Sequence, residues 1–440
     1  MAIFPFLAAA LGLLLSTTVA AQGCPPPLEP SAQLKIRDGY AAQVILNELK
    51  SPRDIVFDTA GNLLVAEQAG GGIRRVVLSE DESGDSVCVV SSAQLIDDAD
   101  LNHGLALTAD GKTLFVSSLP TVDAYPYDAA AGTVGTKRTV ITNMRNEGHN
   151  TRTLLAPVTA PDVLLVSRGS AGNIDNGTTE QASGRSMIKM FSVAELLGAG
   201  EAVEYAEAGE VLGWGLRNSV GVGEDVATGG IWSVENSADN IARANVDLHN
   251  DNPADELNYH GVLASTSNPL KGANYGYPAC FAAWQTTDIP SNEAGLITVG
   301  SQFGGVEGTP YENVTGSTAP EEVDAFCRAQ RQAPRLVFPP HNAPLGVRFA
   351  GDGSAAVVAL HGSWNREPPD GYRLGKIPFA DGQPVASVSD TAAVEYILQN
   401  ENITKCPADC FRPVGLAFDK KGRLFMTSDQ TGELYVITGV

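Results

Sequence analysis

The chain has 440 residues, of which 43% are hydrophobic and 18% charged, so it can bury a large core. Its 29 basic and 51 acidic residues give a net charge of −22 at pH 7. This charge argues against nucleic acid or an anionic membrane as the main partner. The 46 glycines and 26 prolines favour many short strands and turns over long helices.

The first 21 residues are typical of a secretory signal peptide. An apolar run from Ile3 to Leu15 is too short to span a bilayer, and the small residues up to Ala21 fit a cleavage site. We therefore expect a secreted, extracellular protein of residues 22–440, with no membrane-spanning segment. The alternative is a disordered apolar N-terminus on a cytosolic protein.

Six cysteines agree with export, because an even number in a secreted chain suggests disulfides. We expect the pairs Cys24–Cys88, Cys280–Cys327 and Cys406–Cys410, although spacing does not determine connectivity. A metal site at the last pair is the alternative. Sequons for N-glycosylation begin at Asn176, Asn313 and Asn402.

One pattern of two apolar runs joined by a Gly- or Asp-containing turn recurs along the chain. Each copy is typical of a β-hairpin, and further apolar runs lie between the copies. The copies occupy residues 51–68, 101–118, 149–169, 216–236, 342–362 and 411–430. A four-stranded unit with a period near 50 residues is typical of a propeller blade. The sequence thus predicts an all-β fold, a six-bladed β-propeller forming one catalytic domain over 22–440.

The interval from Asn236 to Pro340 is too long for one plain blade connection. It holds Cys280 and Cys327, so we expect a long insertion tied by a disulfide. Within it, the spacing predicts a helix over 318–332 with Thr318 as its N-cap. A second short helix is expected within 190–200.

Every predicted blade carries Arg or His where its first strand begins. These residues are Arg53, His103, His149 with Arg152, Arg217 with Asn218, His341, and Arg412. First strands line the channel of a propeller, so we expect a ring of positive charge at one end of it. Such a ring suits a polyanionic ligand, because Arg binds carboxylates in a bidentate manner. Alternatively, each Arg forms an ion pair with an acid between blades. For Arg53 and for Arg152 we expect this structural role as much as a role in the site.

His149 and Arg152 raise a separate question, because three residues along an extended strand would point to opposite faces. We expect His149 to face the site and Arg152 to lie at the rim or between blades. His103, His149 and His341 stand at blade entrances, and His361 ends a strand. Together they suggest a site that moves protons.

Several of these segments resemble the soluble quinoprotein sugar dehydrogenases. They are "HNTRTLL", "GLRNSVGVG", "DELNYH", "PPHNAPLGVRF", "HGSWNREPPDGY" and "FRPVGLAFD". The closest resemblance is to the secreted fungal pyranose dehydrogenases that use pyrroloquinoline quinone (PQQ). It runs from about Pro52 to the C-terminus, and it implies a six-bladed propeller with PQQ and Ca²⁺ at the top of the channel.

The resemblance also implies roles for single residues. His149 matches the base that removes the proton of the sugar C1 hydroxyl, and Arg217 with Asn218 matches groups that hydrogen-bond the quinone. Arg412 matches a ligand of the cofactor carboxylates, and His103, His341 and Arg366 fall at places of cofactor or substrate contact. The calcium of the relatives is held by backbone carbonyls, which here points to Ser237 and Ala238. An acidic loop at 251–258 is an alternative place for a structural calcium.

Two departures from the family pattern stand out. Bacterial relatives place an Asp behind the catalytic His, whereas Arg168 stands near that position here. The chain carries no haem motif or haem domain, so we expect a separate electron acceptor, such as a cytochrome domain, a copper oxygenase protein or a small oxidant.

The resemblance suggests pyranoses such as L-fucose and 2-ketoglucose as substrates. Two alternatives from other classes remain, a calcium-dependent lactonase-type hydrolase and a non-catalytic binding propeller.

Overall fold

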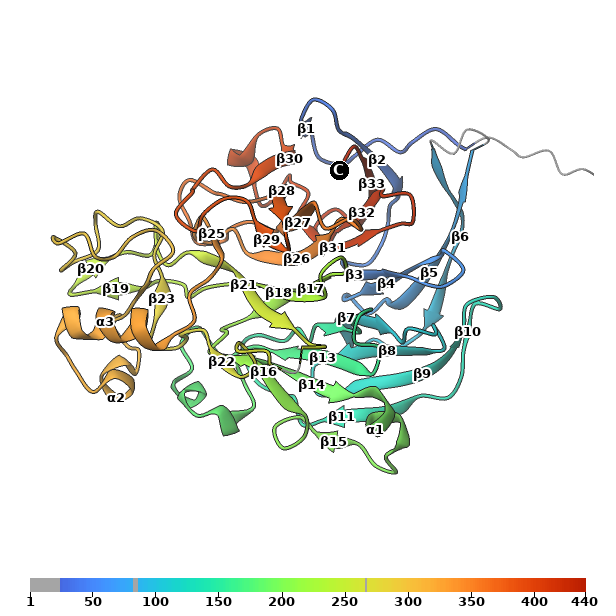
Figure 1. The fold of residues 1–440 in the computed structure, drawn as a ribbon. Helices are drawn as coiled ribbons and strands as arrows, with labels where there is room; N and C mark the ends of the chain where they lie inside the picture. Colours follow the sequence, from blue (N-terminus) through green and yellow to red (C-terminus); the bar gives the residue numbers. More distant parts are fainter. Residues whose placement is uncertain (1–23, 82–85, 266) are drawn as a thin grey trace, which may run out of the picture.

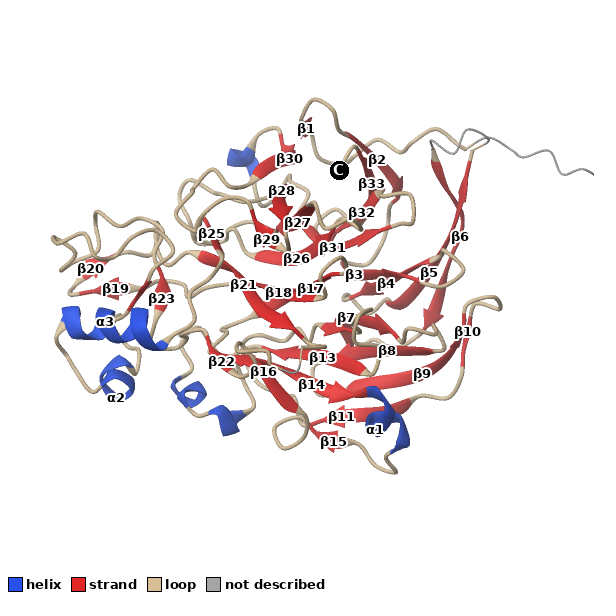
Figure 2. Ribbon diagram, viewed as in Figure 1, coloured by secondary structure: helices blue, strands red, loops and turns tan. Residues whose placement is uncertain are grey.

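The computed structural model of the chain describes residues 24–81, 86–265 and 267–440. The predicted signal peptide at 1–21 lies outside the described residues. Six sheets of four or more strands, antiparallel apart from one parallel pair at the margin of two of them, follow one another along the chain and make up a six-bladed β-propeller, as the repeat predicts (Figures 1 and 2). In the described part of the chain, no helix combines the length and the apolar character needed to cross a membrane.

The first three blades each begin with a predicted hairpin. Blade 1 consists of β3 (Pro52–Phe57), β4 (Leu63–Glu67), β5 (Gly72–Glu80) and β6 (Val87–Ile96). Blade 2 consists of β7 (Leu101–Leu107), β8 (Thr113–Ser118), β9 (Val122–Asp128) and β11 (Arg138–Thr142), with β10 (Thr133–Val134) and β15 (Val203–Glu204) at its margin. Blade 3 consists of β12 (Leu154–Leu155), β13 (Val163–Arg168), β14 (Met187–Ser192) and β16 (Glu210–Trp214), with β22 (Ala273–Asn274) alongside.

The last three blades repeat this plan. Blade 4 consists of β17 (Ser219–Asp225), β18 (Gly230–Glu235), β21 (Asp255–Val262) and β25 (Leu336–Phe338). Blade 5 consists of β26 (Pro344–Phe349), β27 (Ala355–Leu360), β28 (Arg373–Ala380) and β30 (Glu395–Asn400), with β1 (Leu34–Ile36) and β29 (Gln383–Pro384). Blade 6 consists of β31 (Pro413–Phe418), β32 (Leu424–Ser428), β33 (Glu433–Thr438) and β2 (Ala41–Leu46).

The inner strands pack so closely that they require glycine. A Cβ atom on Gly346 of β26 would lie 2.3 Å from Val414 O of the next inner strand. A Cβ atom on Gly415 would likewise lie 2.2 Å from Arg53 O. A side chain at either position would push two blades apart, so these glycines hold the strand entrances near the channel axis.

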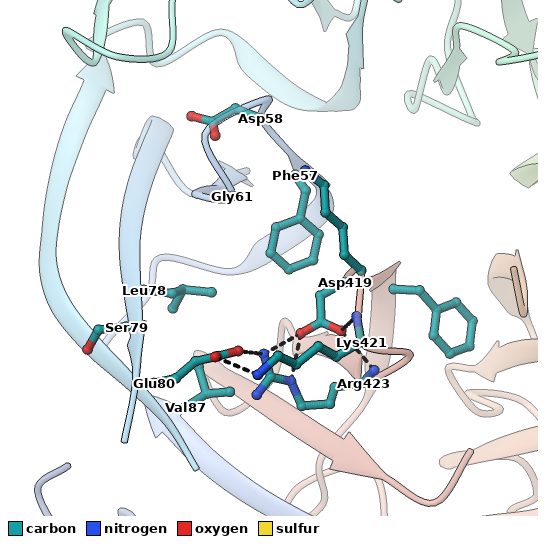
Figure 3. Close-up of a pocket in the computed structure, with 12 residues that line it drawn as sticks. Phe57, Asp58, Gly61, Leu78, Ser79, Glu80, Val87, Asp419, Lys421 and Arg423 are labelled. Carbon is teal, nitrogen blue, oxygen red and sulfur yellow. Dashed lines mark hydrogen bonds and ion pairs between the residues drawn. The ribbon is translucent and has the colours of Figure 1, made fainter. Parts of the chain in front are cut away.

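The two ends of the chain close the ring. Strand β2 pairs with β33 as the outermost strand of the last blade, and the edge-to-face contact of Phe57 with Phe425 joins that blade to the first. Figure 3 shows this junction, where Glu80 of blade 1 accepts ion pairs from Lys421 and Arg423 of blade 6. The last blade is thus completed by a strand from the beginning of the chain.

The expected insertion is divided into two parts. Strands β21 and β25 belong to blade 4, so the added residues are 236–254 and 263–335; we call these two segments the lateral insertion. It contains β19 (Ala242–Arg243), β20 (Val246–Asp247), β23 (Phe281–Ala282), β24 (Gln302–Phe303), α2 (Tyr311–Thr315) and α3 (Pro320–Gln330). It projects from the side of the propeller, at the left of Figure 1.

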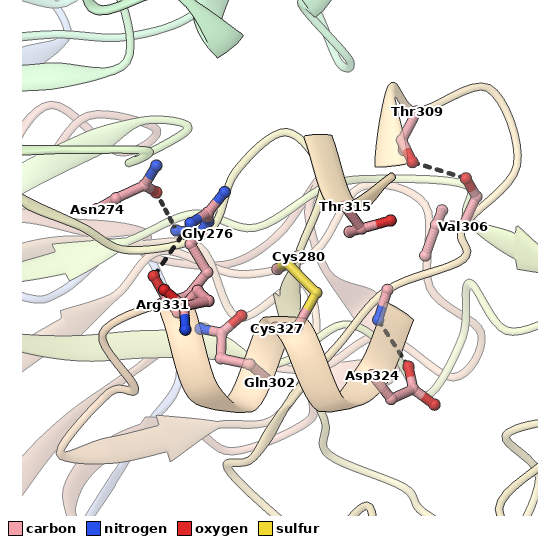
Figure 4. Close-up of a disulfide and its surroundings, with 12 residues drawn as sticks. Asn274, Gly276, Cys280, Gln302, Val306, Thr309, Thr315, Asp324, Cys327 and Arg331 are labelled. Carbon is pink, nitrogen blue, oxygen red and sulfur yellow. Dashed lines mark hydrogen bonds between the residues drawn. A yellow bond between two sulfur atoms is a disulfide. The ribbon is translucent and has the colours of Figure 1, made fainter. Parts of the chain in front are cut away.

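A disulfide and a buried ion pair hold the lateral insertion together. Cys280 bonds to Cys327 of α3 (Figure 4), and the other two predicted disulfides, Cys24–Cys88 and Cys406–Cys410, are also formed. The buried Arg243 donates to both carboxylate oxygens of Asp324 at 2.9 Å. The prediction of Thr318 as N-cap is wrong, because Ala319 is the cap residue and Pro320 begins the helix.

Helix α1 (Val193–Gly198) is present, with Ser192 Oγ accepting from Glu195 N at its start. Three short 3-10 turns cover Asn176–Thr179, Gln181–Ser183 and Ile403–Lys405. The three sequon asparagines are exposed, and their glycosylation remains a prediction.

Closure by β2 generates a stability prediction. Val44 of β2 is buried in the apolar cluster of blades 5 and 6. We expect Val44→Asp to lower the stability of the protein by about 3 kcal/mol or more, since it buries an unpaired charge and removes apolar packing. Gln43→Asp in the same strand, where the side chain is exposed, should change it by less than about 0.5 kcal/mol. Thermal unfolding followed by circular dichroism measures both, and equal effects would contradict the closure role.

Candidate active site

The strand entrances converge on one cavity of about 340 Å³. Loops before the inner strands and after the second strands form its wall. The side chains and backbone that line it belong to Arg53, Gly148, His149, Asn150, Thr151, Arg217, Asn218, Val220, Asn236, Ser237, Asp239, Asp255, His341, Ala343, Leu345, His361, Gly362, Trp364 and Arg412. Five of the six blades thus contribute Arg or His at their entrances, which is the convergence that the repeat predicts.

Most of the residues singled out from the sequence meet at this cavity. His149, Arg217, Asn218, Ser237, His341 and Arg412 line it, together with Arg53 and His361. His103 does not, because it is buried beneath Arg53, whose Nε donates to His103 Nδ1 at 3.3 Å. Ala238 packs in the core of the lateral insertion, and Arg366 lies outside the cavity wall.

His149 is oriented by a serine. Its Nδ1 atom lies 2.9 Å from Ser170 Oγ and 3.2 Å from Ser170 O. Ser170 Oγ donates its own proton to Gly172 O, so both partners of Nδ1 act as acceptors and Nδ1 carries the ring proton. The lone pair is therefore on Nε2. Burial and the charge of Arg217 lower the pKa of His149 to about 3, so the imidazole is neutral in ordinary buffers.

Arg152 and Arg168 support this part of the chain from behind. Arg152 is fully buried and donates to the carbonyl oxygens of His149, Thr151 and Met144, so it is not a rim residue. Burial lowers its pKa to about 9. Arg168, which stands near the position of the Asp in bacterial relatives, donates to Gly184 O and Arg145 O. Ser170, two residues further along, is the partner of His149 instead.

Asp239 connects two of the predicted site residues. Its Oδ2 atom accepts from Arg217 at 3.0 Å, and its Oδ1 atom lies 3.2 Å from His341 Nδ1. The other ring nitrogen of His341 contacts His249 O. Both nitrogens therefore face acceptors, which favours the imidazolium form. The pKa of His341 is raised, since these contacts outweigh its burial.

Asp429 has the same role on the other side of the cavity. It accepts from Arg53 at 2.8 Å and from His361 Nε2 at 2.9 Å. Burial lowers the pKa of His361 to about 4, so His361 donates to the carboxylate as a neutral ring. The sequence alternative of a paired Arg53 is therefore confirmed, but its partner is Asp429 and not the adjacent Asp54.

Arg412 differs from the other cavity arginines. Its guanidinium donates to the carbonyl oxygens of His361 and Gly362 at 3.2 and 3.0 Å. Among the described residues no carboxylate forms an ion pair with it. Burial lowers its pKa, but an arginine remains charged at neutral pH. Arg412 therefore offers the cavity a positive charge that is offset only at a distance, by Asp429.

Three buried acids lie at blade 4, of which Asp255 lines the cavity and Glu235 and Glu256 do not. Asp255 accepts from the backbone N–H groups of Ser237 and Ala343, each at 2.9 Å. Glu235 accepts from Asn218 N and from Ser219 Oγ, and it pairs across the sheet with Glu256. Burial raises their pKa values to about 6 for Asp255, about 8 for Glu235 and about 7 for Glu256. These acids position the backbone around Asn218 and Ser237.

Sequence reasoning missed Ser170, Asp239, Asp255, Asp429 and Trp364. All except Trp364 are partners of a predicted residue. Each lies 18 to 376 positions from that residue in the sequence, and the fold brings the two together. Trp364 is part of "HGSWNR", a motif that was singled out without a role for its indole. Of the four acceptors, none carries a local signal that separates it from the other Asp and Ser residues of the chain.

Residues 34–440 match the family described as TrAA12-like. The chain belongs to this family. A Hypocrea jecorina protein named pyrroloquinoline quinone-dependent sugar dehydrogenase is 44% identical over 403 residues, which are 91% of this chain and 88% of the relative. A Coprinopsis cinerea protein named pyrroloquinoline quinone-dependent pyranose dehydrogenase is 36% identical over 430 residues, which are 94% of this chain but 56% of that longer relative.

Solved structures agree with these matches. The calcium structure of a Trichoderma reesei enzyme of family AA12 superposes with a TM-score of 0.88 at 43% identity, covering 94% of this chain and 99% of that one. The holo form of the Coprinopsis cinerea pyranose dehydrogenase PQQ domain superposes with a TM-score of 0.84 at 35% identity, covering 94% of this chain and 99% of that one. A Streptomyces coelicolor aldose sugar dehydrogenase shares the fold, with a TM-score of 0.55 at 15% identity.

The buried acids generate a prediction about pH. The pKa of Glu235 is about 8 in the fold against a reference value of 4.5, so its protonated form stabilises the folded chain below pH 4.5 and this contribution is lost as the pH rises towards 8. We expect Glu235→Gln to become more stable relative to the wild type between pH 5 and pH 8. Melting temperatures at both pH values measure this difference. Glu207→Gln, at an exposed position, should show none, and a constant difference for Glu235→Gln would contradict the raised pKa.

Proposed function

We propose that the protein is a quinoprotein sugar dehydrogenase that oxidises the C1 hydroxyl of pyranoses with PQQ as its cofactor. The observation that carries the proposal is the pairing of a neutral His149, with its lone pair on Nε2, with Arg217 in a cavity ringed by arginines. The names of the relatives at 44% and 36% identity support it.

The cavity suits PQQ, a planar ortho-quinone with three carboxylates. Arg412 has no ion pair with a carboxylate of the described residues. Arg53 donates to His103 and Asp429 and keeps N–H groups for a ligand, whereas Arg217 donates to Asn173, Asn236 and Asp239 and keeps one. At about 340 Å³ the cavity is near the lower end of the range for small-molecule sites.

A calcium ion fits the charge balance. Asp239 and Asp255 offset part of the positive charge of the wall, so a ligand with several carboxylates needs a further cation. Ser237 lines the cavity beside Asp255, and its carbonyl, with that of Ala238, is the proposed ligand for Ca²⁺. The described residues contain no cluster of three acidic, His or Cys side chains that would hold a metal by itself. This agrees with a site of backbone carbonyls completed by the cofactor.

The chemistry follows from the positions of these groups. When bound, the quinone supplies an acceptor for a hydride from the sugar C1 atom. His149 Nε2 takes the proton of the C1 hydroxyl, and Ser170 holds the ring with Nδ1 protonated. The positive charge of Arg217 and the amide of Asn218 stabilise the negative charge that develops on the acceptor. Because its pKa is about 3, His149 is a weak base that is always in its accepting form.

The finer points of the proposal come from the family resemblance and, for the location, from the predicted signal peptide. We propose L-fucose and 2-ketoglucose as substrates, an extracellular location, and transfer of electrons to a separate acceptor such as a cytochrome domain or a copper oxygenase protein. We also propose that Arg366 does not contact the cofactor. It lies outside the cavity wall and donates to Asn250 O of the lateral insertion.

A lactonase-type hydrolase is less well supported. That reaction requires carboxylates free to bind a catalytic metal, whereas Asp239 is paired with Arg217 and His341. Asp255 accepts two backbone N–H groups. A non-catalytic propeller would leave the arrangement of His149 and Ser170 without a use.

Titration of the isolated protein with PQQ and Ca²⁺ tests the proposal. We expect saturable binding, followed by reduction of a dye acceptor on addition of pyranoses, and loss of both when the metal is chelated. Arg412→Gln should weaken cofactor binding at least about tenfold, as expected for a charged hydrogen bond. Arg366→Gln should leave cofactor binding unchanged. Failure of the wild type to bind PQQ or to reduce the dye with any pyranose would refute the function.

A second prediction concerns the base. We expect His149→Ala to lower kcat by about 10²-fold or more, because it removes the proton acceptor, with cofactor affinity within about threefold of the wild type. Ser170→Ala should give a smaller loss, since the ring remains and Ser170 O still accepts from Nδ1, but the nearer of its two acceptors is removed. Steady-state kinetics and cofactor titration measure the two effects separately. Lost cofactor binding with residual turnover in His149→Ala would contradict the assignment.

A further inference from the structure

The mouth of the cavity carries an indole that the proposed chemistry does not use. Trp364 lines the cavity, yet 70% of its surface is exposed. The described part of the chain has other large apolar side chains at the surface, but Trp364 is the one among them that borders this cavity. We propose that Trp364 forms a stacking subsite for the pyranose ring of the substrate. This inference rests on the proposed function and identifies a sugar-binding surface for it.

The position of the arginines places the sugar near this residue. The arginines that suit the cofactor carboxylates belong to the wall, whereas Trp364 is exposed to solvent at its edge. With the cofactor on these arginines, the side open to a pyranose is the mouth, with C1 towards His149. Trp364 follows β27 in blade 5, whereas His149 precedes β12 in blade 3. The two side chains therefore come from different parts of the wall of one cavity.

The loop that carries Trp364 is held in place on both sides of the residue. Ser363 N donates to Asp370 O at 2.9 Å, and Ser363 Oγ accepts from Asp370 N at 3.0 Å. Asn342 donates to the Asp370 carboxylate at 3.0 Å. The base of the loop is thus tied to the entrance of blade 5.

The far side of the loop is tied to the lateral insertion. Arg366 donates to Asn250 O at 2.7 Å, and Asn250 Nδ2 donates to Glu367 O at 2.9 Å. Asn365 also donates to Asn240 at 3.3 Å. A loop held in this way presents the indole with little ordering cost on binding, which is the advantage of a preorganised site.

An exposed indole next to polar groups matches the chemistry of a sugar. The C–H bonds on one face of a pyranose carry partial positive charge, and the face of an aromatic ring is negative. The hydroxyls at the ring edge remain free for polar groups such as Asn150 and Thr151, which also line the cavity. The same indole would suit an acceptor protein less well, because a single side chain beside a cavity does not make an apolar patch of the usual size.

Kinetics of the PQQ- and Ca²⁺-loaded protein test the subsite. We expect Trp364→Ala to raise KM for the pyranose about tenfold, with kcat and the KM for a dye acceptor within about twofold. Trp364→Phe should restore most of the loss, because it keeps an aromatic face. Val385→Ala, at an exposed apolar residue outside the cavity wall, should behave as the wild type. An unchanged sugar KM in Trp364→Ala, or a rise confined to the KM of a protein acceptor, would overturn the proposal.

A binding measurement separates this inference from the proposed function. Methyl α-L-fucopyranoside has no free C1 hydroxyl and therefore binds without being oxidised. In saturation-transfer NMR with the full chain, we expect its ring C–H signals to receive magnetisation from the wild type and from Trp364→Phe, and to lose it with Trp364→Ala. Persistence of the signals in Trp364→Ala would overturn the stacking subsite. Absence of dye reduction by the wild type, with this NMR pattern intact, would refute the dehydrogenase and leave the sugar subsite supported.

Discussion

The candidate site depends on how buried positive charge is compensated where the blade entrances converge. A desolvated guanidinium without a partner is costly, so the fold supplies two carboxylates. Asp239 is shared by Arg217 and His341, and Asp429 is shared by Arg53 and His361. Each carboxylate joins groups from different elements. Charge compensation therefore also fixes the relative positions of blades 4 and 5 on one side and of blades 1, 5 and 6 on the other.

This compensation is incomplete in a way that serves binding. Arg412 has carbonyl oxygens as partners and no carboxylate among the described residues. The wall thus keeps positive charge at one place, while Asp239 and Asp255 hold negative charge near Ser237. A ligand with several carboxylates and a divalent cation would find complementary charge at each place. A fully neutralised wall would bind neither strongly, and a fully positive one would not be stable without its ligand.

The fold was predictable because its signal is local. All six hairpins and the short helix at Ser192 follow from alternation and turn residues, and the even cysteine count indicates disulfides without determining their pairing. Strands β21 and β25 were not recognised, because the lateral insertion separates them from the hairpin they join and β25 has three residues. The cap of α3 was missed by one residue, since Pro320 at the first helical position leaves Ala319 as the cap.

The site was only half predictable for a related reason. Residues that face the cavity, such as His149, Arg217 and Arg412, stand at repeated positions and are visible in the sequence. Their partners are not, because Asp429 meets Arg53 across 376 residues and Asp255 meets Ala343 across 88. A carboxylate that compensates a charge looks like any surface acid until the ring closes. Ser170 is similar, since nothing in "SRGS" separates a serine that orients an imidazole from one that ends a strand.

The two parts of the wall have separate origins, and this has a consequence for specificity. Groups suited to the cofactor come from inner strands, where glycine packing at Gly346 and Gly415 allows little change. Trp364 stands on a loop held by Asn240 and Asn250 of the lateral insertion. The insertion also carries Asp239, but a change at Asn250, whose contacts go to the Trp364 loop, would shift the indole without removing a carboxylate of the charge network. The propeller can therefore keep one cofactor site while the loop and the insertion together adapt the mouth to different sugars.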